Sequence, residues 1–193
     1  MSGAKHTTSP TRYASAGDFD RIFHEEKDSL YQLSFLLTAD HEKAQQCFVS
    51  GLEDSVKGNA VFKEWARSWA RRTIIQSAVR VINPRPTEEH DRVSFDNNRR
   101  TETIVHGEIG AVLELGSFER FTFVLLVLEH YSEHECSLLL SCSRRDVIAG
   151  QNRALQQLRS TMELQLDQQV SVGSEKLGSL DNYGSTLENV PHV

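Results

Sequence analysis

A group of aromatic and basic side chains, gathered in two short stretches, is the part of this sequence best suited to binding another molecule. The group consists of Trp65, Arg67, Trp69, Arg71 and Arg72 in the first stretch, and Arg144, Arg145 and Arg153 in the second. Guanidinium groups pair with phosphate oxygens, and tryptophan rings stack on unpaired bases. Residues of these types therefore suggest contact with nucleic acid.

A purely structural interpretation stands beside this one. Trp65 and Trp69 lie about one helical turn apart, so they share a helix face, and we expect at least one of them to pack in the core. Arginines on an exposed helix face are ordinary solvated charges. The residue types alone leave both interpretations open.

Histidines and cysteines in the second half of the chain are the candidates for a metal site. They are His130, His134, Cys136 and Cys142. Their spacing does not match a closed zinc pattern, and an expected turn after His130 separates the first from the others. The chain has no glycine-rich phosphate loop and no pattern typical of a catalytic triad. We therefore expect no metal, no cofactor and no enzyme activity.

The balance of charge limits how the chain could hold nucleic acid. It has 193 residues and a formal net charge of −6 at pH 7. An acidic protein binds DNA poorly by itself, because affinity depends on neutralising phosphates. A protein partner that supplies most of the DNA contacts would remove this difficulty.

The composition predicts neither a membrane span nor a secreted protein. The longest apolar run, residues 121–128, is too short to cross a bilayer. Residues 1–15 lack the apolar core of a signal peptide, and three cysteines do not suggest a disulfide framework. We expect a cytoplasmic protein.

Apolar residues recur at helical spacing through most of the chain, which predicts an all-α fold. Two small helical domains are expected, at residues 18–82 and 104–166, joined by a charged linker at residues 83–103. Residues 1–17 and 167–193 are polar, and both ends are expected to be disordered.

Local signals predict where several helices begin and end. In the first domain Asp18 and Asp40 are the expected N-caps, and one long helix is expected from Val61 to about Ile82. The apolar stripe of the helix after Asp40 is expected to be Ala44, Phe48, Val49 and Leu52.

The second predicted domain contains a tight turn between two helices. Ser132 and Glu135 have the spacing of a capping box that starts one helix, and Ser143 is placed to cap the next. Two helices joined by a short turn, the second beginning with basic residues, are typical of a helix-turn-helix. In that motif Arg144 and Arg145 would lie on the part of the second helix that enters the major groove of DNA.

An ordered series of residues links these features to a known family. The second domain carries Leu115, Arg120, the apolar run 123–128, Glu129–His130–Tyr131–Ser132, Glu135–Cys136–Ser137, Leu140, Ser143, Val147, Arg153–Ala154–Leu155 and Leu158–Arg159. In this order and spacing it resembles the promoter −35-binding region of bacterial sigma factors, particularly the extracytoplasmic-function type. Residues 19–82, with a helix, Leu37–Thr38–Ala39–Asp40, a second helix, and Trp69–Ala70–Arg71–Arg72, resemble the polymerase- and −10-binding region of the same family.

The resemblance implies a transcription initiation factor that binds core RNA polymerase and directs it to promoter DNA. The DNA-binding residues it implies are Arg67, Arg71, Arg72, Arg144, Arg145 and Arg153. The polymerase-binding residues it implies are Gln45, Gln46, Phe48 and Val49. It also brings in an anti-sigma factor as a candidate partner.

Several positions depart from the family pattern. Gln45 and Gln46 stand where the family has an acidic pair, and Gly116 stands where it has proline. Residues 148–151 lack the basic residues usual in the last helix, and Gly150 is expected to weaken that helix by roughly 1 kcal/mol relative to alanine. These departures favour an alternative: a degenerate sigma-like protein that regulates by protein interaction and no longer recognises promoters.

Overall fold

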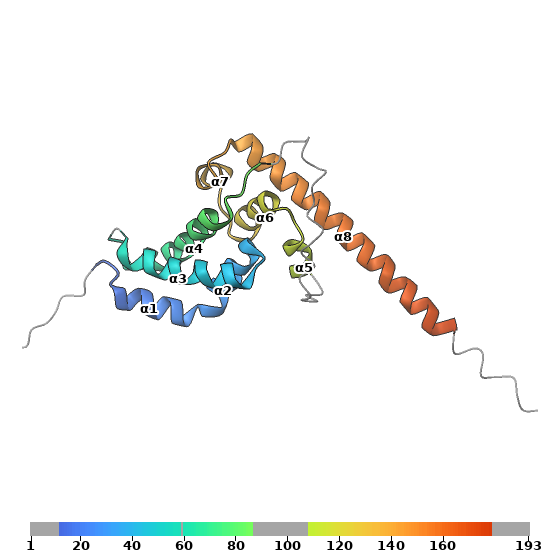
Figure 1. Cartoon of the computed structure of the whole chain (residues 1–193), viewed down its shortest axis with the longest axis horizontal. Coiled ribbons are helices and arrows are strands. Elements are labelled where there is room, and N and C mark those ends of the chain that lie inside the picture. The colour runs from blue at the N-terminus through green and yellow to red at the C-terminus, as the bar shows by residue number, and fades with distance from the viewer. Residues whose placement is uncertain (1–11, 59, 87–107, 179–193) are drawn as a thin grey trace, which may run out of the picture.

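The chain folds into helices. The structure, a computed structural model, describes residues 12–58, 60–86 and 108–178, with side chains from residue 109 in the last of these ranges and up to residue 163 in the last helix. All the elements in these ranges are helical, and the only strand-like feature there is a single bridge between Tyr13 and Phe62. The prediction of an all-α fold is therefore confirmed (Figure 1).

The N-terminal half contains four α-helices and one short 3₁₀ turn. They are α1 (Ala16–Glu25), α2 (Lys27–Thr38), α3 (His41–Lys57), η1 (Lys63–Trp65) and α4 (Ala66–Ile82). Asp40 caps α3 as predicted, because its Oδ1 accepts a hydrogen bond from Lys43 N at 3.0 Å. The long helix predicted from Val61 begins with η1 instead, and its α-helical part starts at Ala66.

The chain is ordered earlier than residue 18, where the sequence analysis placed the start of structure. Ser15, not Asp18, is the N-cap of α1, and Asp18 completes the capping box from the third helical position. Ala14 N donates to Val61 O at 2.7 Å, next to the bridge that Tyr13 forms. Residues 12–17 are thus held against the segment that leads into α4, and residues 1–11 lie outside the described range.

The C-terminal half begins with short helices and ends with a long one. Its elements are α5 (Glu108–Leu113), α6 (Ser117–Phe123), the π-helix η2 (Val124–Leu128), α7 (Glu133–Leu139) and α8 (Arg144–Gly178). Ser132 and Glu135 form the predicted capping box, and Ser143 Oγ accepts from Asp146 N at 3.1 Å at the start of α8. The last helix continues past residue 166 to Gly178, so the tail expected to be disordered from residue 167 is helical over its first part. Residues 87–103 of the expected linker and residues 179–193 of the tail lie outside the described ranges.

Two glycines allow helices to approach closely. A Cβ at Gly51 of α3 would lie 2.7 Å from Ile74 Cγ1 of α4, and a Cβ at Gly150 of α8 would lie 2.7 Å from Phe118 Cε1 of α6. A Cβ this close would force the facing side chain or helix to shift, so glycine at each position allows the close crossing. Gly150, expected only as a weak point of its helix, is a packing requirement.

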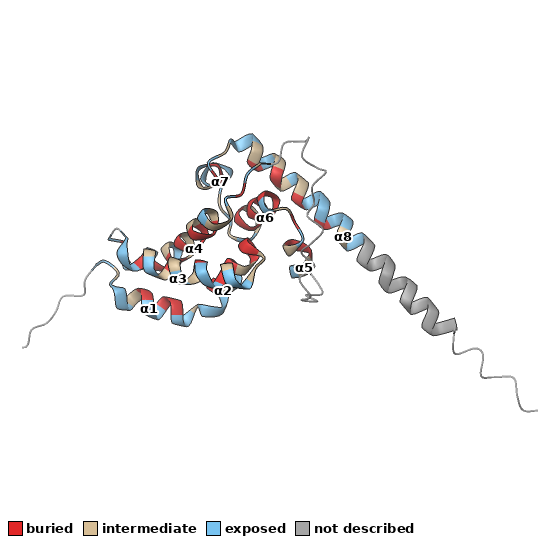
Figure 2. Cartoon of the chain, in the orientation of Figure 1, coloured by how far each residue is buried: buried red, intermediate tan, exposed pale blue. Residues whose placement is uncertain are grey.

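The two halves touch each other, and buried residues run from one into the other (Figure 2). The α2 helix packs against α5 and α6. Arg120 of α6 is buried at this contact, where its Nε donates to Leu37 O at the end of α2 at 3.2 Å. Its Nη1 donates to the carbonyls of Leu113 and Leu115 at 3.2 and 3.0 Å. One guanidinium thus ties three chain segments together.

Candidate nucleic-acid interface

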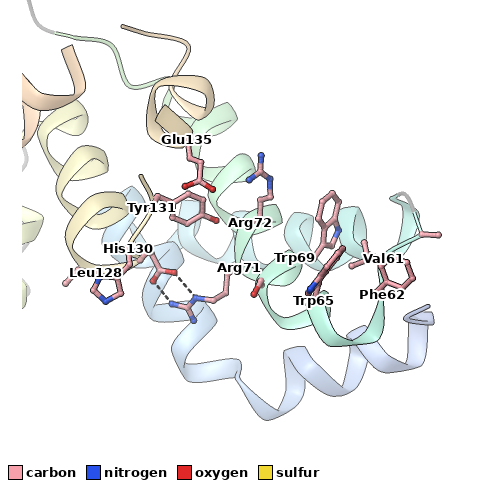
Figure 3. Close-up of a pocket in the computed structure, with 13 residues that line it drawn as sticks. Val61, Phe62, Trp65, Trp69, Arg71, Arg72, Leu128, His130, Tyr131 and Glu135 are labelled. Carbon is pink, nitrogen blue, oxygen red and sulfur yellow. Dashed lines mark hydrogen bonds and ion pairs between the residues drawn. The ribbon is translucent and has the colours of Figure 1, made fainter. Parts of the chain in front are cut away.

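An open groove of about 1040 Å³ lies between the two halves (Figure 3). One side is formed by η1 and α4, and the other by the turn that follows the π-helix and by the start of α7. The side chains that line it are mainly aromatic or charged. They include Phe62, Trp65, Trp69, Arg71 and Arg72 from the first side, and Glu129, His130, Tyr131 and Glu135 from the second.

Helical spacing explains why both tryptophans, Trp65 at the end of η1 and Trp69 in the first turn of α4, face the groove. Residues four apart lie on one helix face, so Trp65 and Trp69 stand one above the other. Trp65 is 59% exposed, and its ring meets Phe62 edge-on with centroids 5.3 Å apart. Phe62 is itself stacked on Tyr13 at 4.8 Å. The exposed indole is therefore supported from behind by other rings and presents a free surface to the groove.

Trp69 confirms the expectation that at least one tryptophan packs on the core. It is partly buried, and its ring lies 3.8 Å from the position of a Cβ on Gly58. Its Nε1 is buried without a hydrogen-bond partner among the described residues. Trp69 is mainly structural, which leaves Trp65 as the stacking surface.

The three arginines of the first cluster have different surroundings. Arg67 forms ion pairs with Glu25, at 2.8 Å, and with Glu26. Arg71 binds Glu129 from across the groove, with a distance of 2.8 Å from Nε to Oε2 and a second contact from Nη2 to Oε1. Arg72 is half-buried and makes no ion pair with any residue in the described ranges. Arg72 is thus the arginine of this cluster whose charge is least neutralised.

Acidic and phenolic groups of the second side lie near enough to Arg72 for its charge to be felt. The pKa of the Glu135 carboxyl is lowered, chiefly by hydrogen bonds from Ser132 and further by the charge of Arg72. Burial raises the pKa of the Tyr131 phenol, and Arg72 acts in the opposite direction. Both groups are therefore in their ordinary states at neutral pH, with Glu135 charged and Tyr131 neutral.

The second arginine cluster lies apart from this groove. Arg144 and Arg145 are exposed on the first turn of α8, and neither lines the groove. Asp146 is occupied by hydrogen bonds from Ser143, which lower the pKa of its carboxyl. Arg153, expected as a phosphate contact, instead forms an ion pair with the buried Glu119 at 2.8 Å between Nε and Oε1. The two basic clusters are thus not brought into one site, and Arg153 is held by the protein itself.

The residues expected to contact polymerase are only partly accessible. On α3, Gln45 and Gln46 are exposed, and Val49 has 49% of its surface exposed. Val49, predicted to lie in the apolar stripe of this helix, is therefore outside its buried face. Phe48 is half-buried, with its ring edge-on to Phe23 at 5.3 Å. Gln45, Gln46 and Val49 form the part of this set that a partner can reach.

The candidate metal ligands do not assemble into a site. Within residues 12–58, 60–86 and 108–163, no group of three or more histidine, cysteine or acidic side chains is placed to hold a metal ion. Cys136 is fully buried, and burial raises the pKa of its thiol to about 12. It behaves as a core residue of α7.

Glu129, Tyr131 and Arg120 carry part of the family resemblance, but the contacts that they make were not predicted from the sequence. The partner of Glu129, Arg71, lies 58 positions away, and Leu37 lies 83 positions from Arg120. No local spacing signals pairs so distant in sequence. Glu129 does lie two residues before the predicted break at Tyr131, and an acidic residue at such a corner was the one available hint.

Comparisons with known proteins leave the geometry as the guide to function. No protein-family model matches the chain, and no curated protein matches it in sequence. Of the helices in the described ranges, none combines the length and apolar character needed to cross a bilayer.

Proposed function

We propose that this chain is a cytoplasmic, sigma-factor-like transcription initiation factor, which binds core RNA polymerase and directs it to promoter DNA. The observation that carries the proposal is the groove beside α4, where the exposed Trp65 shares one open surface with Arg72, which forms no ion pair with a described residue. A stacking ring and a guanidinium in one groove suit a single nucleic-acid strand. The action is recruitment and strand separation, so the chain itself needs no catalytic group.

Residues 18–82 would form the domain that meets polymerase and the −10 element. Trp65 would stack on an unpaired base of the melted strand, and Arg72 would bind its phosphate. The preceding helix, α3, offers Gln45, Gln46 and Val49 to the polymerase. The side-chain amides of the two glutamines can donate and accept hydrogen bonds at a charged partner surface, which supports docking without an acidic pair.

Residues 104–166 would form the second domain, in which α7, the turn and α8 act as a helix-turn-helix. The turn between the two helices is short, and Ser143 fixes the start of α8. Arg144 and Arg145 are exposed on the first turn, which is the part of a recognition helix that faces base edges. Their guanidinium groups suit guanine O6 and N7.

A second candidate function is that of a sigma-like regulator, which acts by protein interaction and does not recognise promoters. The observation that favours it is the pairing of Arg67, Arg71 and Arg153 with carboxylates of the same chain. Those three arginines are neutralised internally, and the whole chain is acidic, with a net charge of −6. An anti-sigma factor is a protein of the kind that such a regulator would bind.

A promoter-selection assay with the full chain tests the proposal. Purified chain is added to core RNA polymerase and a library of promoter fragments, and transcripts are sequenced. We expect transcripts from a defined subset of promoters, lost in Trp65→Ala but not in Glu53→Gln, a change at an exposed residue away from the groove. Retention on polymerase without any selected promoter would support the regulator instead. Failure to be retained on polymerase would contradict the first proposal.

A further inference from the structure

An ion pair between Arg71 and Glu129 bridges the groove, and Arg71 is one of the residues expected to bind DNA. Arg71 belongs to α4 in the N-terminal half, and Glu129 belongs to the corner that follows the π-helix in the C-terminal half. Two nitrogens of the guanidinium face two oxygens of the carboxylate, and Arg71 Nη1 also donates to Ser29 Oγ at 2.9 Å. A phosphate group would use the same two-point geometry on the same arginine.

The pair is well shielded from solvent, unlike the other ion pairs of α4. The Arg71 side chain is 29% exposed and that of Glu129 is 10% exposed, whereas Arg67 and Arg80 are each more than half exposed. Screening by water and salt is weaker at a shielded pair. The attraction between Arg71 and Glu129 is therefore stronger than the attraction in the exposed ion pairs of Arg67 and Arg80.

The backbone places Glu129 at this point. In the π-helix each turn contains one extra residue, so Glu129 N bonds to Val124 O, five residues back, at 2.9 Å. Tyr131 N then bonds to Leu125 O at 2.9 Å, and His130 between them has a φ of 58° in the left-handed region. A π-turn followed by a residue with positive φ is a costly local conformation. Its effect here is to turn the chain so that the Glu129 carboxylate meets Arg71 of α4. The Tyr131 ring faces the same helix (Figure 3).

We propose that Glu129 is an internal competitor for nucleic acid: its carboxylate takes the place of a backbone phosphate on Arg71 and keeps that arginine from the strand. This inference rests on the proposed binding of a single DNA strand along α4. While the Arg71–Glu129 pair is formed, the strand meets only Arg72 and Trp65. Binding through Arg71 requires that the Arg71–Glu129 pair be broken first. The apparent affinity for the strand is therefore the intrinsic affinity multiplied by the fraction of molecules in which the pair is broken.

Affinity for a labelled single-stranded oligonucleotide, measured with the full chain, tests the competition. Glu129→Gln keeps the shape of the side chain but removes its charge. We expect it to bind the strand about tenfold more tightly than the unmodified chain, a change that corresponds to ~1.4 kcal/mol. The matched control is Glu133→Gln, which removes the same charge from an exposed residue of α7 that forms no ion pair with a described residue. An equal gain in both variants would show a net-charge effect and would overturn the proposal.

A second pair of variants assigns the effect to Arg71. Arg71→Ala combined with Glu129→Gln should return the affinity to about that of Arg71→Ala alone, because no arginine remains to be released. Glu129→Asp retains the charge on a shorter side chain and should give a gain smaller than that of Glu129→Gln. A gain in Glu129→Gln that persists without Arg71 would overturn the proposal.

Amide hydrogen exchange without DNA separates this inference from the proposed function. In Glu129→Gln we expect faster exchange on both sides of the Arg71–Glu129 contact, in the part of α4 around Arg71 and in the corner from Glu129 to the start of α7, and not in Glu133→Gln. If the unmodified chain directs polymerase to promoters but Glu129→Gln changes neither strand affinity nor exchange, the competitor role is wrong and the proposed function stands. If no variant binds a strand while Glu129→Gln still speeds amide exchange beside the Arg71–Glu129 contact, the nucleic-acid role of the groove is wrong and both proposals fall.

Discussion

Arg120 shows how one side chain can hold two halves of a protein together. Only 7% of its surface is exposed, and it forms no ion pair with a described carboxylate. Its charge is balanced by carbonyl oxygens at the ends of α2 and α5, where the last turns of a helix have free acceptors and partial negative charge. Burial lowers the pKa of Arg120 to about 10, so the group remains charged at neutral pH.

The first prediction concerns this residue. Arg120→Leu fills similar apolar space but leaves three buried carbonyls without their donor. We expect it to lower the free energy of unfolding by about 2–4 kcal/mol, measured by urea denaturation. Arg120→Lys can still reach one or two of the carbonyls and should lose less. Equal stability of the leucine variant and the unmodified chain would show that the two halves do not depend on this contact.

The second prediction concerns Gly150. Alanine is the better helix former by roughly 1 kcal/mol, so sequence reasoning alone predicts that Gly150→Ala stabilises the protein. The structure predicts the opposite sign, because the new methyl group would meet Phe118 at 2.7 Å and Thr122 Oγ1 at 3.0 Å. Moving α6 and α8 apart to make room for the methyl group should lower the free energy of unfolding by about 1–3 kcal/mol, which outweighs the gain in helix propensity.

Gly17 of α1 offers a matched control for that change. A Cβ there would meet only Ser15 Oγ, at 3.9 Å, and the residue is exposed. Gly17→Ala should raise the thermal midpoint slightly, by the equivalent of about 0.4–1 kcal/mol. A rise in both variants would contradict the close approach of α6 and α8.

At the level of helices, capping boxes define where three of them begin. Ser15 with Asp18, Ser132 with Glu135, and Ser143 with Asp146 each place a serine before the helix and an acid three residues later. In each case the acid accepts a hydrogen bond from the serine backbone. The acids therefore act on helix ends, and Asp146 in particular is committed to α8.

The capping box of α1 gives the third prediction, on pH dependence. Hydrogen bonds from the Ser15 backbone and side chain, with the charge of Lys63, lower the pKa of Asp18 from 3.8 to about 2. A carboxyl whose pKa is lower in the folded state stabilises the fold above its unfolded pKa, and loses that effect as pH falls through the folded value. The thermal midpoint of Asp18→Ala should therefore lie below that of the unmodified chain at pH 6, and the two should converge as pH approaches 2.

Local signals account for what could be predicted about these elements. The caps at Asp40, Ser132 and Ser143 were found because a cap and its partner lie within three residues of each other. The cap of α1 was placed at Asp18 because either member of a Ser-x-x-Asp pair can start a helix. The π-helix at Val124–Leu128 was missed, since one extra residue per turn leaves an unbroken apolar run that also fits an α-helix.

At the level of the whole molecule, the distribution of free positive charge sets how the chain would bind duplex DNA. Arg153 is bound to Glu119, so Arg144 and Arg145 are the exposed arginines at the start of α8. The helices that position them were predictable from spacing. The ion pair that removes Arg153 from the DNA-binding set was not predictable, because its partner Glu119 lies 34 positions away. The same limit applies to the groove, whose two sides come from different halves of the chain.

The fourth prediction follows from that distribution. For duplex DNA, the logarithm of the binding constant should fall against the logarithm of salt concentration with a slope of about −2, since each phosphate contact contributes about −0.9. Replacing Arg144 and Arg145 with alanine should flatten the line. Arg153→Ala should leave the slope unchanged and lower the thermal midpoint, because it strands a carboxylate that is 7% exposed. A reduced slope in Arg153→Ala would show that this arginine leaves Glu119 to meet DNA.

The α8 helix adds a mechanical consequence. Its 35 residues make a rod of about 52 Å, at 1.5 Å per residue. The first part packs against α6 and α7 as far as the buried Leu158, and the rest, about 30 Å long, projects from the body of the molecule (Figure 1). A rigid rod is a lever, and a tilt of ~10° moves the far end of this projecting part by ~5 Å. If the Arg71–Glu129 contact opens by a small rotation of the C-terminal half, Gly178 moves several times farther than the two side chains of that contact. The far end of α8 is thus the place where a minor change in the groove becomes a large displacement.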